Sequence, residues 1–373
     1  MSPTRHPLRA LRVLAVSQYG RIEVGGAERY LHETLVRLRR RGLQIQTLHA
    51  DDTESSGQIS SPWRFFSAGF NLLWARQVSR LLEQWRPDVI YAHWSVPGLV
   101  DLVVRKARTR GIPVCLVYHS DVTGDDWFRK LLGLAYHRVI GRATLASIDC
   151  LLVSSLTYLQ ASPWLSELND IPIRYAEPGV DEAMTRARRY DCPPYLLFVG
   201  KADVRSKGFK LLYRAWQCVH ARFPEVGLTV IGPKPSGDYP GVRFLGPVLD
   251  RETLATWYAS AMVTVLPSTT TSESFGMVLA EALVAGCPII GSRIGGISDI
   301  VSHGENGYLV SPGDIDALTD ALGRIIEDHE QIKTHIASNQ PALIQRFDWD
   351  RTSDQVESAL KSIAHLDVRL TAY

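Results

Sequence analysis

The stretch Ser268–Ile290, STTTSESFGMVLAEALVAGCPII, decides the fold of this chain. The apolar run before it, Val263–Pro267, predicts a buried strand. The stretch itself predicts a polar loop and then a helix that begins near Ser274. A period of 3.6 residues places four positions on one stripe of that helix: Leu279, Ala282, Leu283 and Gly286. We expect this stripe to face the core of an α/β domain.

Two glutamates in this stretch are candidate binding residues. Glu273 stands at the start of the predicted helix, and Glu281 lies inside it on a face away from the core stripe. The backbone amides of Phe275, Gly276 and Met277 fall at the positive end of the helix, where an anion is well placed. The segment therefore offers two acceptors for hydroxyl groups with an anion site between them. The alternative is a pair of solvated glutamates on a surface helix.

Length and composition exclude several classes of protein. A chain of 373 residues suits two domains, each with its own core. A net charge of +2 argues against a nucleic-acid partner. No apolar run approaches the ~18 residues that cross a bilayer, and Val13–Val16 is too short for a signal peptide. We therefore expect a cytoplasmic protein, which can still touch the inner face of the plasma membrane.

The cysteines support the same location. They are widely spaced and form no C-x-x-C pair: Cys115, Cys150, Cys192, Cys218 and Cys287. An odd, scattered set predicts buried free thiols in a reducing compartment rather than disulfides or a zinc site.

The N-terminal half begins with a strand, a glycine turn and a helix. Arg12–Ser17 is the predicted strand, Gly25 and Gly26 end the loop, and Ala27–Arg41 is the predicted helix. This geometry lets the backbone approach a phosphate, and the alternative is a plain turn. The loop lacks the G-x-G-x-x-G pattern of a dinucleotide fold, which argues against a nicotinamide-dependent oxidoreductase.

Two histidines end predicted strands. Asp88–Trp94 contains His93, and Pro113–His119 closes on His119. A histidine at the carboxyl end of a parallel strand lies where open α/β sheets bind ligands. We expect His119 to be such a residue and His93 to be structural.

Two segments of this half carry basic and aromatic residues together. Ser61–Trp85 and Trp127–Ala146 are predicted as amphipathic helices. The first contains Trp63, Phe65, Phe66, Phe70 and Trp74, and the second contains Trp127, Arg129, Lys130, Arg138 and Arg142. Such helices bind anionic membrane surfaces; the alternatives are aromatic core packing and a solvated charged face.

The C-terminal half repeats the alternation of strands and helices. Residues 185–194 form a hinge, and Tyr195–Gly200 begins a second sheet. Lys201 and Lys207 bracket the loop that follows, and Arg205 lies between them. Ile315–Ile336 is predicted as one long helix. Strand–helix alternation in both halves predicts two doubly wound sheets with a cleft between them.

The chain resembles retaining glycosyltransferases of family 4, which have the GT-B fold. The resemblance depends mainly on ESFGMVLAEALVAGCPIIGSRIGGISDIV, Glu273–Val301, and on NGYLV, Asn306–Val310. It implies two Rossmann-like doubly wound parallel sheets that face each other across a cleft. The expected domains are residues 1–184, which bind the acceptor, and residues 185–349, which bind the nucleotide sugar. The last helix, about residues 350–373, is expected to pack back on the N-terminal domain.

The resemblance also implies roles for residues. The expected catalytic residues are His119, Lys201, Lys207, Glu273 and Glu281. The expected donor-binding residues are Gly25, Gly26, Arg205, Gly232, Phe244, Leu245, Ser274, Phe275, Gly276, Met277 and Val278. The family usually has arginine at position 201; lysine keeps the charge without the bidentate fork, and Arg205 is a candidate to compensate. No Asp-x-Asp pair lies in a suitable place, so we expect neither a metal nor a cofactor.

The implied activity is retaining transfer of a hexose from GDP-mannose, UDP-glucose or UDP-N-acetylglucosamine. The implied acceptor is a glycan or a lipid-linked saccharide in surface polysaccharide biosynthesis. Two alternatives stay open. One is a sugar-nucleotide 2-epimerase of the same fold, and the other is a non-catalytic, membrane-associated protein that binds sugar nucleotides.

Overall fold

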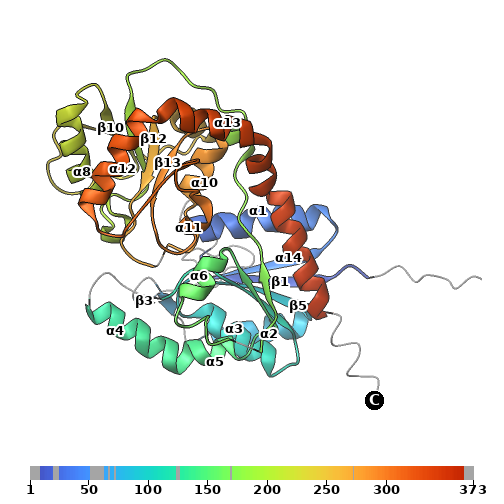
Figure 1. The fold of residues 1–373 in the computed structure, drawn as a ribbon. Helices are drawn as coiled ribbons and strands as arrows, with labels where there is room; N and C mark the ends of the chain where they lie inside the picture. Colours follow the sequence, from blue (N-terminus) through green and yellow to red (C-terminus); the bar gives the residue numbers. More distant parts are fainter. Residues whose placement is uncertain are drawn as a thin grey trace, which may run out of the picture. The chain divides into compact units, whose positions relative to one another are not determined.

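The computed structural model describes residues 9–19, 25–50, 63–65, 68–70, 73–122, 127–168, 170–271 and 273–364. They form two compact units, each with a six-stranded parallel sheet (Figure 1). The first unit comprises Met1–Val153, Glu167–Ala176 and Thr352–Tyr373, and the second comprises Ser154–Ser166 and Glu177–Arg351. The prediction of two doubly wound parallel sheets is confirmed.

The sheet of the first unit has the order β2-β1-β5-β6-β7-β8. Its strands are β1 (Arg12–Ser17), β2 (Gln44–His49), β5 (Val89–Trp94), β6 (Val114–Tyr118), β7 (Cys150–Val153) and β8 (Ile173–Tyr175). All of β5 is buried, because helices cover a parallel sheet on both faces. Helix α1 (Gly26–Arg40) contacts β2, whereas α3 (Leu99–Arg108) packs on β1, β5 and β6 and contacts α2 (Trp74–Trp85).

A second set of helices completes this unit. Helix α4 (Trp127–Tyr136) continues through the π-helical turn His137–Gly141 into α5 (Arg142–Leu145), so the predicted helix over this segment is present. Helix α14 (Trp349–Ala364) contributes its residues from Thr352 onward. Its Val356 and Leu360 are buried, and its Glu357 accepts from Arg41 at 3.1 Å.

The sheet of the second unit has the order β11-β10-β9-β12-β13-β14. Its strands are β9 (Tyr195–Val199), β10 (Gly227–Ile231), β11 (Val242–Gly246), β12 (Val263–Leu266), β13 (Ile289–Ser292) and β14 (Gly307–Val310). Its helices are α6 (Leu156–Ala161), α7 (Glu182–Thr185), α8 (Phe209–Arg222), α9 (Arg251–Ser260), α10 (Met277–Val284), α11 (Ile297–Ile300), α12 (Ile315–Glu327) and α13 (His329–Arg346). Helix α8 lies beside α12, and α10 packs on β12, β13, α9 and α13. The order of the strands reverses between β9 and β12.

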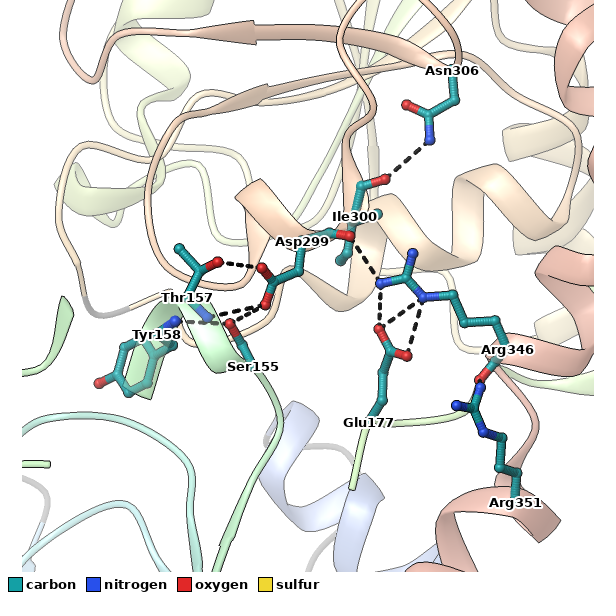
Figure 2. Close-up of polar contacts among 9 residues, drawn as sticks. All are labelled: Ser155, Thr157, Tyr158, Glu177, Asp299, Ile300, Asn306, Arg346 and Arg351. Atoms are coloured by element: carbon teal, nitrogen blue, oxygen red, sulfur yellow. Dashed lines mark hydrogen bonds and ion pairs between the residues drawn. The ribbon is translucent and has the colours of Figure 1, made fainter. Parts of the chain in front are cut away.

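The second unit begins earlier than residue 185 and includes α6. Two carboxylates, the half-buried Asp299 and the buried Glu177, attach both additions, as Figure 2 shows. Asp299 of α11 accepts hydrogen bonds from the hydroxyls of Ser155 and Thr157. Glu177 is buried and accepts three hydrogen bonds from Arg346 of α13, one at 2.6 Å and two at 3.1 Å. The same Arg346 donates to the carbonyl of Asp299 at 2.9 Å, so one arginine joins the two attachments.

Two predicted helices differ from the structure. Ser61–Trp85 is not one helix, because β3 (Trp63–Phe65) and β4 (Ala68–Phe70) form an antiparallel pair before α2. Aromatic residues favour strands, and Gly69 weakens a helix. The single long helix Ile315–Ile336 is also wrong. Asp328 ends α12 and precedes α13, and its carboxylate accepts from the Tyr308 hydroxyl at 2.8 Å.

The five cysteines are free thiols, as predicted, but they are not all buried. Cys115, Cys150 and Cys287 are buried, Cys192 is half-buried, and Cys218 is exposed.

Gly208 permits a close approach between two loops of the second unit. Its φ of +74° lies in the left-handed region, and a Cβ there would stand 1.9 Å from the carbonyl oxygen of Pro267. We predict that Gly208→Ala lowers the free energy of unfolding by about 2 kcal/mol or more, because the side chain meets both strain and backbone.

Thermal unfolding checks this prediction, with Gly323→Ala as the matched control. Gly323 lies inside α12 with open space around it, so alanine there should stabilise by up to about 1 kcal/mol. An unchanged melting temperature in Gly208→Ala would contradict the prediction.

Candidate active site

The candidate site of the second unit lies at the carboxyl edge of its sheet. The loops after β9 and β12 both begin there, at the point where the strand order reverses. In open α/β sheets this reversal leaves a crevice in which ligands bind. Most of the residues that the sequence nominated in this half belong to these two loops and to the start of α10.

Lys207 and Glu273 form an ion pair across these loops. Lys207 ends the short helical turn Arg205–Lys207, and the amide of Thr269 donates to the carbonyl of Ser206 at 2.8 Å, which joins the loops. The side chain of Glu273 is 15% exposed, whereas that of Lys207 is 37% exposed. The pair therefore presents an ammonium group at the rim of the site and a carboxylate beneath it.

The other basic residues of the β9–α8 loop have a different placement. Lys201 and Arg205 are both exposed. They carry positive charge at the carboxyl edge of β9 and are accessible to an anion.

Helix α10 begins at Met277, later than the predicted Ser274. Gly276 precedes it with a φ of +94°, which delays the helix. The amides of Met277 and Val278 belong to the first turn, where an α-helix supplies no acceptor. The ring of Phe275 is buried beside Phe347, so this residue can offer a ligand its backbone only.

Two glycines support the loop that carries Glu273. A Cβ on Gly295 would lie 2.3 Å from the carbonyl oxygen of Glu273, and one on Gly296 would lie 2.3 Å from that of Ser274. The turn before α11 therefore packs directly on the backbone of Glu273 and Ser274. The Gly-Gly pair in the sequence was the available signal for this support, and it was not interpreted as part of the site.

Glu281 is buried in a polar network rather than exposed on the helix surface. Arg251 of α9 forms an ion pair with its Oε1, and the Tyr258 hydroxyl donates to its Oε2 at 3.0 Å. The Nε of Arg251 also lies 3.7 Å from Asp181. The expected core stripe of α10 is correct for Leu279, Ala282 and Leu283, which are buried, whereas Gly286 is half-buried.

Arg251 and Tyr258 were missed by the sequence analysis. Both lie on α9, which precedes β12 in the chain and meets α10 only after folding. The one local signal was Asp250, which caps α9 by accepting from the amide of Thr253 at 2.8 Å. It identifies where the helix starts and carries no information about its partner.

The remaining donor candidates lie at the ends of β10 and β11. Gly232 follows β10, and a Cβ on it would stand 2.0 Å from the carbonyl oxygen of Gly200, so the ends of β9 and β10 touch. Phe244 and Leu245 are half-buried on β11. The ring of Phe244 packs against Phe209, so it belongs in part to the core.

The candidate residues of the first unit lie at the carboxyl edge of its own sheet. Gly25 and Gly26 are exposed at the start of α1. His119 follows β6, and its Nε2 lies 2.9 Å from Nδ1 of His93. His93 is 2% exposed, whereas His119 keeps part of its surface accessible. The arrangement places the buried histidine behind the accessible one.

Neighbouring rings keep both histidines neutral at neutral pH. Tyr30 of α1 packs on His93 and His119 with ring centroids 5.8 and 5.6 Å away. Desolvation lowers the pKa of His119 to about 4, and it lowers the pKa of His93 well below the usual range, with His119 adding to that effect.

An apolar and basic surface covers α4 and the turns after it; we call it the α4 surface. Its apolar members are Trp127, Phe128, Leu131, Leu134, Val139 and Ile140, each at least 38% exposed. Its basic members are Arg129, Lys130, Arg138 and Arg142, all exposed. In the other predicted membrane segment, Trp74 is 2% exposed and packs in the core, and the side chains of residues 61–72 lie outside the described residues.

Within the described ranges, no group of three or more histidine, cysteine, aspartate or glutamate residues is arranged to hold a metal ion. None of the helices seen in that part of the chain is both long and apolar enough to cross a membrane.

The fold defines a class of protein. Sucrose-phosphate synthase of Thermosynechococcus elongatus has the same fold, with a TM-score of 0.74 at 21% identity, over 94% of this chain and 98% of that one. The complex of Anabaena HepE with UDP and glucose has a TM-score of 0.72 at 19% identity, over 94% of this chain and 100% of that one. The two sheets and these similarities define a GT-B protein.

The sequence comparisons identify the family. Residues 24–181 match the model for Glycosyltransferase Family 4, and residues 193–328 match the model for Glycosyl transferases group 1. A phosphatidyl-myo-inositol mannosyltransferase of Mycolicibacterium smegmatis is 27% identical over 312 residues, 79% of this chain and 76% of the relative. The chain belongs to family 4 of the glycosyltransferases, and its resemblance to that family is confirmed.

Two desolvated histidines, the half-buried His119 and the buried His137, should make stability depend on pH. Desolvation lowers the pKa of His119 and of His137 to about 4. Between pH ~6.5 and ~4 the unfolded chain then binds more protons than the folded chain. We predict that their contribution to stability is fully present above pH ~6.5 and is lost as the pH falls, by up to about 1.4 kcal/mol per pH unit for each histidine.

Melting temperatures measured from pH 7 down to pH 4.5 test this prediction. His119→Asn should flatten the dependence. His32→Asn, which changes an exposed histidine of α1, should leave it unchanged. The same slope in His119→Asn and in the unmodified protein would contradict the prediction.

Proposed function

We propose that this protein transfers a hexose from a nucleotide-diphosphate sugar to an acceptor hydroxyl with retention of anomeric configuration. The observation that carries the proposal is the clustering of complementary groups at the switch point of the second sheet. The ion pair between Lys207 and Glu273, the first amides of α10 and the buried carboxylate of Glu281 lie on the loops after β9 and β12 and on α10.

These groups suit a departing nucleoside diphosphate. Lys201, Lys207 and the amides of Gly276 and Met277 would balance the charge that grows on the phosphate as the glycosyl–phosphate bond breaks. The acceptor oxygen would bond to the anomeric carbon on the face that the phosphate leaves. The leaving phosphate would take the proton of the acceptor hydroxyl, so no side chain need act as nucleophile.

The glutamates would bind hydroxyl groups. In this proposal Glu273 binds the transferred sugar, Glu281 binds the ribose, and His119 contacts the sugar near its 6-hydroxyl. Lysines and helix amides would neutralise the diphosphate without a metal ion, and the reaction would need no cofactor.

The donor would be GDP-mannose, UDP-glucose or UDP-N-acetylglucosamine. A relative that is a mannosyltransferase by name supports the first, and the complex of HepE with UDP and glucose supports a uridine nucleotide. The acceptor would be a glycan or a lipid-linked saccharide used in surface polysaccharide biosynthesis.

The α4 surface supports an acceptor held at a membrane on its cytoplasmic side. Exposed apolar patches of this kind mark interaction sites, and interleaved basic residues match anionic lipid. Trp127 is 77% exposed and Val139 is 74% exposed, which is costly in water without a partner. In this proposal the protein is peripheral, and its aromatic and basic residues contact lipid headgroups.

Incubation with a panel of nucleotide sugars tests the activity. We expect free nucleoside diphosphate and a glycosylated product with retained configuration, at an undiminished rate in EDTA. Release of a 2-epimer would favour the epimerase alternative, and binding without turnover would favour a non-catalytic protein. Loss of activity in EDTA with rescue by magnesium or manganese would overturn the metal-free mechanism.

Lys207→Ala should weaken binding of the nucleoside diphosphate by ~2–4 kcal/mol, because it removes the cationic partner of a charge pair that the bound diphosphate would desolvate. Calorimetric titration measures this loss. The matched control is Lys210→Ala, which changes an exposed lysine at the start of α8 and should bind as the unmodified protein does. Equal affinity in both variants would remove Lys207 from the site.

Membrane binding is tested by flotation with vesicles. We predict binding to vesicles that contain anionic phospholipid, little binding to neutral ones, and release at high salt, since salt screens the attraction. Replacing Arg129, Lys130 and Arg138 by glutamine should reduce binding without changing nucleotide affinity. The matched control replaces Arg105, Lys106 and Arg108, three basic residues at the end of α3, by glutamine as well. Absence of binding to anionic vesicles at low salt would favour a soluble acceptor.

A further inference from the structure

The carboxylate of Glu281 is held from two directions. Arg251 forms an ion pair with one oxygen, and the Tyr258 hydroxyl donates to the other at 3.0 Å. The Glu281 side chain is 6% exposed, whereas that of Arg251 is 30% exposed. The carboxylate is therefore buried, whereas part of the Arg251 side chain is accessible to solvent.

Arg251 is itself held in place. It is the first residue of α9, directly after the capping residue Asp250. Its Nε lies 3.7 Å from Asp181, whose other oxygen caps α7 by accepting from the amide of Ala183 at 2.9 Å. Two carboxylates flank one guanidinium, so the three charges sum to −1. Of these three residues only Glu281 is buried, since the side chains of Asp181 and Arg251 are 28% and 30% exposed.

Tyr258 is suited to act as a permanent donor in this network. The residue is fully buried on α9. Burial raises the pKa of its hydroxyl well above the usual value, and the neighbouring Glu281 raises it further. The hydroxyl therefore stays protonated at neutral pH and donates to the carboxylate.

We propose that Arg251 and Tyr258 are positioning residues that hold the Glu281 carboxylate in the orientation that accepts the ribose hydroxyls of the donor nucleotide. This inference rests on the proposed function, in which Glu281 binds the ribose. A carboxylate accepts about four hydrogen bonds, so protein donors can orient it while it also accepts from a ribose hydroxyl. Selection for ribose over deoxyribose then depends on Arg251, although Arg251 itself touches the carboxylate and not the sugar.

Calorimetric titration of the full chain with GDP, UDP and their 2′-deoxy forms tests this inference. The better-binding base is used for the comparison. In the unmodified protein, the deoxy form should bind about tenfold more weakly or worse, because the carboxylate loses a donor that it was oriented to meet. In Arg251→Met, the ribose and deoxyribose forms should bind with nearly equal affinity. Arg251→Lys should restore part of the discrimination, since lysine keeps the charge and loses the fork.

Two further variants control for folding and for loss of charge. Tyr258→Phe keeps the buried ring and removes one donor, so discrimination should fall to an intermediate value. Arg222→Met breaks an exposed pair with Glu327, 2.6 Å long, in the same unit and should leave discrimination unchanged. Melting temperatures show which variants are folded. If Arg251→Met does not fold, the discrimination measured in Tyr258→Phe tests the positioning role instead.

The outcomes separate this inference from the proposed function. Equal binding of ribose and deoxyribose forms by the unmodified protein would remove Glu281 from the ribose site and overturn this inference, whereas the panel of nucleotide sugars decides the proposed activity separately. Unchanged discrimination in Arg251→Met would overturn the positioning role alone. If Arg251→Met does not fold, unchanged discrimination in Tyr258→Phe would have the same consequence. Loss of discrimination in Arg251→Met and its retention in Arg222→Met would establish the role.

Discussion

The reversal of strand order between β9 and β12 is the constraint on which the candidate site of the second unit depends. Right-handed crossovers place the connections that leave β9 and β12 on opposite faces of the sheet, so their first loops diverge at the carboxyl edge. At this edge the backbone amides of the loops can donate to a ligand, so they are not buried without a hydrogen-bond partner. Gly208 and Gly232 keep this edge compact, because each lies against a carbonyl oxygen where a side chain does not fit.

Cations or hydroxyl donors meet the carboxylates of this unit that are buried (Glu177, Glu281) or half-buried (Asp299, Glu273). Glu177 with Arg346 and Asp299 with Ser155 and Thr157 attach chain segments to the unit (Figure 2). Glu281 with Arg251 and Glu273 with Lys207 lie at the site instead. Both kinds follow one rule, since a buried carboxylate is costly unless a cation or several donors meet it. Exposure does not separate the two kinds, because the side chains of Arg346, Lys207 and Arg251 each keep about a third of their surface in reach of solvent. The difference is position, since Lys207 and Glu273 lie on the loops at the carboxyl edge of the sheet.

The two units use the same edge for different chemistry. In the second unit the carboxyl ends of the strands carry lysines, helix amides and carboxylates, which suit a charged, hydroxyl-rich ligand. In the first unit they carry His93 and His119, which desolvation keeps neutral. Neutral imidazoles exchange hydrogen bonds with hydroxyl groups and do not repel a cation or attract a diphosphate. The first unit also carries the α4 surface, whose exposed apolar and basic residues are not among the candidate site residues.

The sequence by itself determined the alternation of strands and helices, the fold class, the family and the loop that carries Glu273, because these depend on local periodicity and on short motifs. Local preference failed where tertiary contacts compete with it. The segment before α2 pairs as a hairpin, and Gly276 moves the start of α10 past Ser274. Only the tertiary structure decided the partners of Glu281, since Arg251 and Tyr258 lie on a helix that precedes it by more than twenty residues. It also decided which aromatic residues stay in water: Trp74 is buried and Trp127 is exposed, although both stand in amphipathic helices. The pattern of a helix shows that it has an apolar face, and packing decides whether another part of the chain covers it.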